Sequence, residues 1–178
     1  MSTPHDGMPA ALFLNGTVGA GKTSVADTAG ELLAETGVPH AVLDLDWLCR
    51  AWPAPPGDPF NGALLLRNLR DVTRNARAAG AVRLVLAGVI EDAAGRRAVT
   101  DALGVPLTVC RLAVGLPVIH ERLRARHQGD EDALRWHLDR SGELDAIIAA
   151  SGTTDLTVPS TGPVTDIARA VLTRAGWL

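Results

Sequence analysis

Short apolar runs alternate along this chain with longer segments in which apolar residues recur at helical spacing. A short apolar run is typical of a strand buried on both faces, whereas a spacing of about 3.6 residues indicates a helix packed on one side. The runs predicted as strands are residues 10–14, 41–45, 82–87, 107–114 and 155–158. The segments predicted as helices are residues 23–35, 61–79, 116–127, 132–150 and 163–175.

This alternation predicts an α/β fold in which helices cover both faces of a parallel sheet. No repeat or long linker interrupts the pattern, so we expect residues 1–178 to form a single domain. Prolines forbid regular structure in one stretch, residues 52–58. Ligands of such sheets bind beyond the carboxyl ends of the strands, so the segments that follow each strand are the candidates for function.

A glycine-rich segment follows the first predicted strand and reads G-x-x-x-x-G-K-T from Gly16 to Thr23. A strand before it and a helix after it are the context in which this motif forms a phosphate-binding loop. The glycines allow a tight turn that points backbone N–H groups inward, and the helix start adds a partial positive charge. Lys22 is expected to reach the β- and γ-phosphates of ATP, and the Thr23 hydroxyl to bind Mg²⁺. The expected nucleotide-binding residues are Gly16, Thr17, Val18, Gly19, Ala20, Gly21, Lys22, Thr23 and Ser24.

Composition and charge exclude several classes of partner. The formal net charge of −3 gives no general attraction to nucleic acid or to an anionic membrane. Aromatic residues make up 3% of the chain and tyrosine is absent, which disfavours stacking platforms for single strands. Cys49 and Cys110 form no C-x-x-C pair, and residues 1–8 lack the apolar core of a signal peptide. We therefore expect a cytoplasmic protein with no nucleic-acid or membrane partner; no pattern indicates an oligomeric state.

With its phosphate loop and its alternating elements, the chain resembles the nucleoside monophosphate kinase-like branch of the P-loop kinases. This branch includes adenylate, shikimate and gluconate kinases and chloramphenicol phosphotransferase. The resemblance implies a three-layer sandwich with a five-stranded parallel sheet in the order 2-3-1-4-5 and a mobile lid. It also implies that ATP and Mg²⁺ are the cofactors.

Two carboxylates, Asp44 and Asp46, end the second predicted strand with side chains on one face. They resemble the Asp-x-Asp of shikimate kinase, which implies a place near the Mg²⁺ for Asp44. The same resemblance implies that Asp46 holds the acceptor hydroxyl and takes its proton, as a carboxylate within hydrogen-bond reach can do. The alternative is that both acids cap a helix that begins near Trp47.

Arg122 and Arg126 lie four residues apart on one face of a predicted helix. The resemblance to adenylate kinase implies that Arg122 stacks on adenine and that Arg126 reaches the transferring phosphate, although both would also suit a solvated basic face. It implies a short lid at about residues 127–131. It also implies that backbone at Thr161 and Gly162 borders the adenine ring, where a plain turn is the alternative.

The third predicted strand departs from the family, because it has no Walker-B aspartate and no triple glycine. Glu91 or Asp92 would orient Mg²⁺ through water, or would simply begin the next helix. Arg67 and Arg70 are candidates to bind an anionic acceptor, with a solvated helix face as the alternative.

Together these features predict an ATP-dependent phosphotransferase that acts on a hydroxyl of a small-molecule acceptor. Catalysis would rest on Lys22, Asp46 and Arg126, with Thr23 and Asp44 binding the metal. A nucleoside monophosphate kinase is disfavoured, because the phosphate of such an acceptor requires several arginines. The alternative from another class is a regulatory nucleotide-binding module, which an acceptor pocket filled by Trp47, Trp52 or Phe60 would favour.

Overall fold

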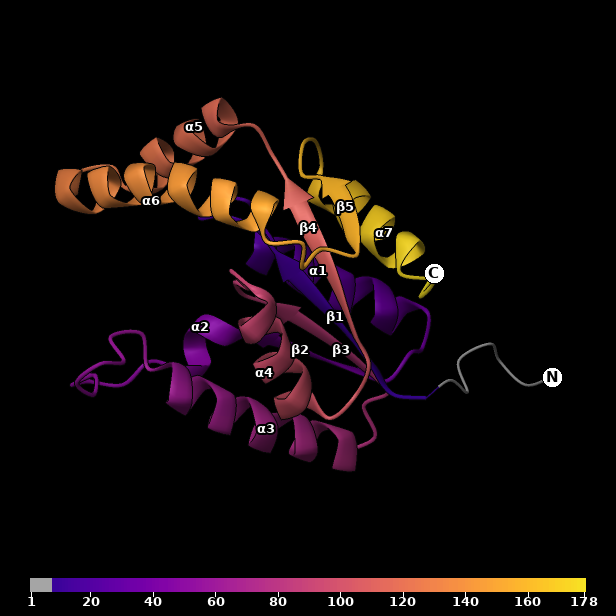
Figure 1. Ribbon diagram of the computed structural model, residues 1–178. Helices are drawn as coiled ribbons and strands as arrows, with labels where there is room; N and C mark the ends of the chain where they lie inside the picture. Colours follow the sequence, from indigo (N-terminus) through magenta and orange to yellow (C-terminus); the bar gives the residue numbers. More distant parts are fainter. Residues whose placement is uncertain (1–7) are drawn as a thin grey trace.

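The computed structural model describes residues 8–178 and contains a five-stranded, all-parallel sheet (Figure 1). The strand order is β2-β3-β1-β4-β5, which confirms the predicted fold class and order. The strands are β1 (Ala10–Asn15), β2 (His40–Asp44), β3 (Arg83–Ala87), β4 (Leu107–Ala113) and β5 (Leu156–Pro159). Each observed strand overlaps a predicted one, because an apolar run between turn residues can only be buried in such a sheet.

Seven helices lie between these strands or after the last of them within the described residues. They are α1 (Lys22–Glu35), α2 (Leu45–Leu48), α3 (Gly62–Ala78), α4 (Ala93–Leu103), α5 (Leu116–Arg126), α6 (Glu131–Ala150) and α7 (Val164–Arg174). The apolar spacing predicts five of them and misses α2 and the extent of α4. α4 begins with small and charged residues and buries only Val99, Ala102 and Leu103, so no apolar run marks its start in the sequence.

Two apolar cores separate the helices into layers on either side of the sheet. Residues of α1 and α7 form the first core, and residues of α3 and α4 contribute to the second. β1 is buried on both faces, since Leu12 and Leu14 enter the first core while Ala11 and Phe13 enter the second. This central strand therefore fixes the position of the loop that follows it.

The α5–α6 hairpin extends beyond the carboxyl ends of the strands (Figure 1). It is attached to the sheet by an ion pair of 2.7 Å between Arg111 of β4 and Asp145 of α6. It is attached to the loop after β1 by a hydrogen bond of 2.6 Å from the Thr17 hydroxyl to the Ser141 carbonyl. The hairpin thus covers the edge of the sheet at which ligands of parallel sheets bind.

None of the helices between residues 8 and 178 combines the length and the apolar character needed to cross a membrane. The expectation that no signal peptide is present concerns residues 1–8, most of which lie outside the described residues.

Candidate active site

The loop between β1 and α1 has the backbone that the glycine motif requires. Gly19 and Gly21 have φ of 82° and 88°, in the left-handed region that favours glycine. A Cβ on Gly16 would lie 3.1 Å from Ala20 Cβ and 3.2 Å from the Leu112 carbonyl oxygen, so a side chain there would crowd the loop. Val18 is half-buried within the loop, and Ser24 is exposed in the first turn of α1.

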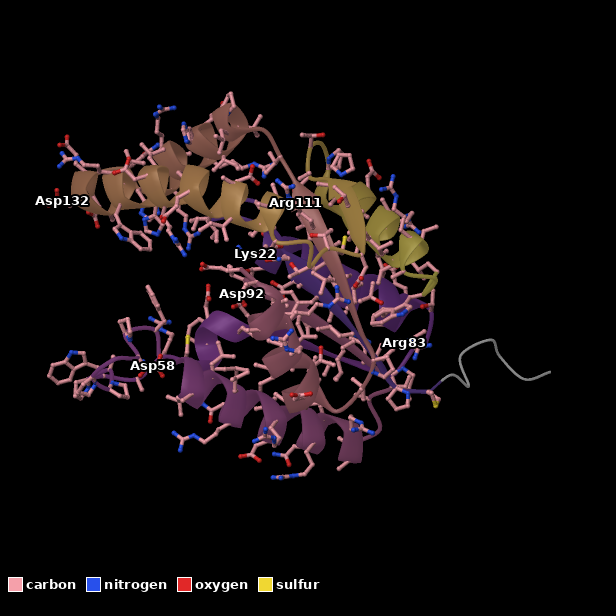
Figure 2. All side chains as sticks on the ribbon, viewed as in Figure 1. Lys22, Asp58, Arg83, Asp92, Arg111 and Asp132 are labelled. Atoms are coloured by element: carbon pink, nitrogen blue, oxygen red, sulfur yellow. The ribbon has the colours of Figure 1, made fainter. Side chains whose placement is uncertain are left out.

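Lys22 begins α1, and its ammonium lies within the loop rather than in solvent (Figure 2). Nζ donates to the carbonyl oxygens of Gly16 at 2.9 Å and of Thr17 at 3.0 Å. Burial lowers the pKa of Lys22 to about 8, while the carboxylates of Asp46 and Asp44 oppose this shift and Arg126 adds to it. The charges of Asp46, Asp44 and Arg126, each predicted from the sequence, therefore act on Lys22.

Asp44 links β2 to the phosphate loop. Its Oδ2 accepts a hydrogen bond of 2.7 Å from the Thr23 hydroxyl, and its Oδ1 accepts one of 2.9 Å from the Asp46 backbone N–H. The second bond makes Asp44 the N-cap of α2. Capping and contact with Thr23 are thus performed by the same carboxylate, so the two alternatives for this residue do not exclude each other.

Asp46 does not cap the helix, because it lies in the first turn of α2. Its side chain is exposed, whereas the preceding Leu45 is buried under the sheet. The carboxylate is the foremost of the two that stabilise the charged form of Lys22. Because the Asp46 side chain is exposed, its carboxylate is accessible to a second ligand bound next to the phosphate loop.

Arg126 lies in the last turn of α5, and its side chain is exposed. It faces the phosphate loop closely enough to disfavour the charged form of Lys22. The lid predicted at about residues 127–131 coincides with the turn between α5 and α6 and the first residue of α6. Asp130 caps α6 by accepting from the Ala133 N–H at 3.0 Å.

Arg122 joins the phosphate loop to the connection between β5 and α7. Its guanidinium donates to the carbonyl oxygens of Gly19 at 3.3 Å and of Ser160 at 3.0 Å. The buried Ser160 hydroxyl donates in turn to the Ala20 carbonyl at 2.8 Å. Thr161 and Gly162 follow Ser160 and are exposed. The predicted stacking of Arg122 on adenine stays a prediction.

Two residues that position the loop were not among the predicted site residues, namely Asn15 and Ser160. Asn15 is fully buried at the end of β1, and its Oδ1 accepts from the N–H groups of Gly16 at 3.0 Å and Ile90 at 3.1 Å. Its Nδ2 donates to the Ile90 carbonyl at 2.9 Å. A polar residue that directly ends an apolar strand is the signal in the sequence that marks Asn15.

The remaining acidic and basic candidates have other partners or lie in solvent. Asp92 accepts from the Gly95 N–H at 2.7 Å and caps α4, as the helix-start alternative predicts. Glu91 forms an ion pair of 2.5 Å with Arg140 of α6. Arg67 and Arg70 are exposed on α3.

No protein-family model matches the sequence. No curated protein matches it either. Solved structures do match, over nearly the whole chain. The tunicamycin resistance protein of Deinococcus radiodurans has a TM-score of 0.65 at 21% identity, over 97% of this chain and 98% of that chain. The APS kinase of Mycobacterium tuberculosis, in complex with AMPPNP and APS, has a TM-score of 0.63 at 22% identity, over 95% and 98%. A gluconokinase of Sinorhizobium meliloti has a TM-score of 0.58 at 19% identity, over 94% of each chain.

These structural neighbours are P-loop kinases, and the chain shares their fold. The identities are low, so the likeness concerns the architecture and leaves the acceptor to be inferred from the residues of this chain.

Proposed function

We propose that this chain, which has the fold of the P-loop kinases, is an ATP-dependent phosphotransferase that acts on a hydroxyl of a small molecule. One arrangement carries the proposal: the Lys22 ammonium is bonded within the phosphate loop, and Asp46 and Arg126 both act electrostatically on it. A buried cation for phosphate, a second cation and an accessible carboxylate are the groups that phosphoryl transfer to a hydroxyl needs.

In this proposal the loop backbone and Lys22 bind the β- and γ-phosphates of ATP. The loop carbonyls that now hold the Lys22 ammonium are weaker partners than phosphate oxygens, so the ammonium transfers to the nucleotide. Arg126 approaches from α5 and stabilises the charge that develops on the γ-phosphoryl group. Closure of the turn at residues 127–130 would exclude water from this group.

Mg²⁺ would be held by the Thr23 hydroxyl and, directly or through water, by Asp44. The two oxygen atoms lie 2.7 Å apart, and hard oxygen ligands are those that Mg²⁺ prefers. Residues 8–178 contain no cluster of three His, Cys, Asp or Glu side chains that could hold a metal, so phosphate oxygens and water would complete the coordination. When bound, Mg²⁺ would neutralise part of the negative charge of the phosphates.

Asp46 is proposed to hold the acceptor hydroxyl and to accept its proton. The acceptor oxygen bonds to the γ-phosphorus as the bond to the bridging oxygen breaks and ADP leaves. An exposed carboxylate beside the phosphate loop has the access and the charge for this role.

The exposure of the aromatic side chains disfavours the regulatory alternative. Trp47, Trp52 and Phe60 are 68%, 93% and 73% exposed, so they do not fill an acceptor pocket. Arg67 and Arg70, the candidates to bind an anionic acceptor, are exposed on α3. Phosphotransfer to a hydroxyl is therefore the function that the site supports best.

The test is to titrate the protein with ATP in the presence of Mg²⁺ by calorimetry and to follow ADP release in a screen of hydroxyl compounds. We expect ATP binding, and ADP release that depends on the added compound. Lys22→Ala should abolish both and keep the circular dichroism spectrum, because the ammonium contacts loop carbonyls and no apolar core. A native protein that binds no ATP would refute the proposal.

A further inference from the structure

The aromatic residues of this chain are distributed unevenly. Phe13 and Trp177 are buried in the core that each joins. The other four are exposed, and they are Trp47 at 68%, Trp52 at 93%, Phe60 at 73% and Trp136 at 54%. Three of these four lie in one segment of the chain, which runs from α2 to the start of α3. We call Trp47, Trp52 and Phe60 the aromatic surface; large apolar side chains that a folded segment leaves in solvent are candidates to contact a ligand.

Hydrogen bonds hold the segment that carries the aromatic surface. The Asn61 side-chain amide donates to the carbonyl oxygens of Cys49 at 2.9 Å and Ala51 at 3.0 Å. The Asn68 amide donates to the Leu48 carbonyl at 2.7 Å. These bonds anchor both ends of residues 48–61 on α3, so the exposure of the rings is a property of a folded loop.

The aromatic surface begins directly beside the proposed acceptor carboxylate. Trp47 follows Asp46 in α2, and the Arg50 guanidinium lies 4.6 Å from the centre of the Trp47 ring. An open hollow of about 350 Å³ is lined by Cys49, Arg50, Ala51 and Trp52. Figure 2 shows Asp58 of this segment and Asp132, one turn before Trp136, on the same side of the molecule, with Lys22 set farther in.

Charge on this segment is sparse. Between Trp47 and Phe60 the only charged side chains are Arg50 and Asp58. The Asp58 carboxylate accepts from the N–H groups of Gly62 at 2.7 Å and Ala63 at 3.0 Å, and these bonds lower its pKa. One arginine, already over a tryptophan ring, is a poor site for an acidic acceptor, whereas three ring systems suit an apolar one.

We propose that the acceptor is an uncharged, amphipathic hydroxyl compound whose apolar ring or chain packs on Trp47, Trp52 and Phe60. This inference rests on the proposed function, since its hydroxyl lies at Asp46. The acceptor oxygen bonds to the γ-phosphorus, and the bond to the oxygen that bridges to the β-phosphate breaks. ADP leaves with that electron pair, and the hydroxyl proton passes to the Asp46 carboxylate.

The test uses two probes with the same hydroxyls, phenyl β-glucoside and methyl β-glucoside. Their affinities are measured by calorimetry with the native protein saturated with a non-hydrolysable ATP analogue and Mg²⁺. We expect the phenyl compound to bind at least about tenfold more tightly, the usual effect of burying one aromatic ring on another. Trp52→Ser and Phe60→Ser should each remove most of this difference and leave ATP affinity unchanged.

Met8→Ser is the matched control, because Met8 is 80% exposed and precedes β1 at the opposite end of the strands. It should keep the full preference for the phenyl compound. Equal affinities for the two glucosides, including the absence of binding by both, would overturn the inference. So would a native dimer that Trp52→Ser converts to a monomer in sedimentation, because the rings would then be an interface between two copies. Failure of the proposed function is seen separately, as a lack of ATP binding.

Discussion

Lys22 is the residue whose charge depends most on the fold. Its pKa is lowered from 10.5 to about 8, chiefly by burial within the phosphate loop. The protonated form is the one that binds phosphate, and bound phosphate in turn favours protonation. Binding of phosphate at the loop is therefore coupled to protonation of the Lys22 amine.

The first prediction concerns the affinity for ATP between pH 7 and about 9.5. The affinity should be level below pH 8 and should fall above it, approaching tenfold per pH unit, because the free protein must take up a proton to bind. Calorimetric titrations across this range measure the effect. Lys22→Arg is the control, since a guanidinium stays charged throughout and should give a level profile. A level profile in the native protein would contradict this coupling, because it would mean either that the pKa of Lys22 is not lowered or that Lys22 does not bind the phosphate.

Asp44 shows how one residue can satisfy two demands. Its two carboxylate oxygens have different partners, the Thr23 hydroxyl and the backbone N–H of Asp46. The Asp-x-Asp spacing predicts that both acids reach the phosphate loop, and the capping alternative is also present for Asp44. A sequence pattern cannot separate these roles, because a helix cap and a metal ligand require the same residue type at the same place.

At the scale of elements, the α5–α6 hairpin and the phosphate loop are packed against each other. Ile119 and Leu123 of α5 lie over Gly19, and a Cβ on Gly19 would come within 3.1 Å of Ile119 Cγ2. Arg122 of the same helix binds the Gly19 carbonyl. Any distortion of the hairpin should therefore reach the loop that binds phosphate.

A pair of glycine substitutions tests this packing. Gly19 and Gly104 both have positive φ, of 82° and 62°, but a Cβ on Gly104 would contact nothing within 4 Å. Gly104→Ala should cost only the backbone term, about 1 kcal/mol, and should leave ATP affinity unchanged, because Gly104 caps the far end of α4. Gly19→Ala adds the clash with α5, so we expect a larger loss of stability and at least tenfold weaker ATP binding.

Urea unfolding and ATP titration of the two variants provide the comparison. Equal losses of stability and equal ATP affinities would mean that the hairpin does not restrain the loop.

At the scale of the whole molecule, the sheet is the part that could be predicted most fully from the sequence. Apolar runs such as Leu12–Leu14 are buried on both faces and have no other place in the fold. The strand order followed from the resemblance to P-loop kinases. α4 was largely missed, because only Val99, Ala102 and Leu103 of this helix are buried, and they pack in a core that it shares with α3.

The charged members of the candidate site were predictable, and the residues that hold the loop were not. Lys22 and Thr23 belong to a motif of fixed spacing, so their position follows from the sequence. Asn15 and Ser160 act through backbone groups of distant segments, and such contacts exist only once the strands are assembled. The exposure of Trp52 likewise depends on the anchoring of its loop by Asn61.

The central claim is that Asp46 serves the acceptor while the loop and Lys22 serve the nucleotide, and one measurement separates the two tasks. ATP affinity and the rate of transfer to an acceptor found in the screen are measured for Asp46→Asn beside Asp44→Asn. Asp46→Asn keeps the size of the side chain but cannot take a proton. Its ATP affinity should stay within a few-fold of the native value while transfer falls by about a hundredfold or more. Asp44→Asn can still cap α2, and it should weaken Mg²⁺-dependent ATP binding as well. An Asp46→Asn protein that loses stability and retains transfer would contradict the account, because the carboxylate would then support the fold and the acceptor would bind elsewhere.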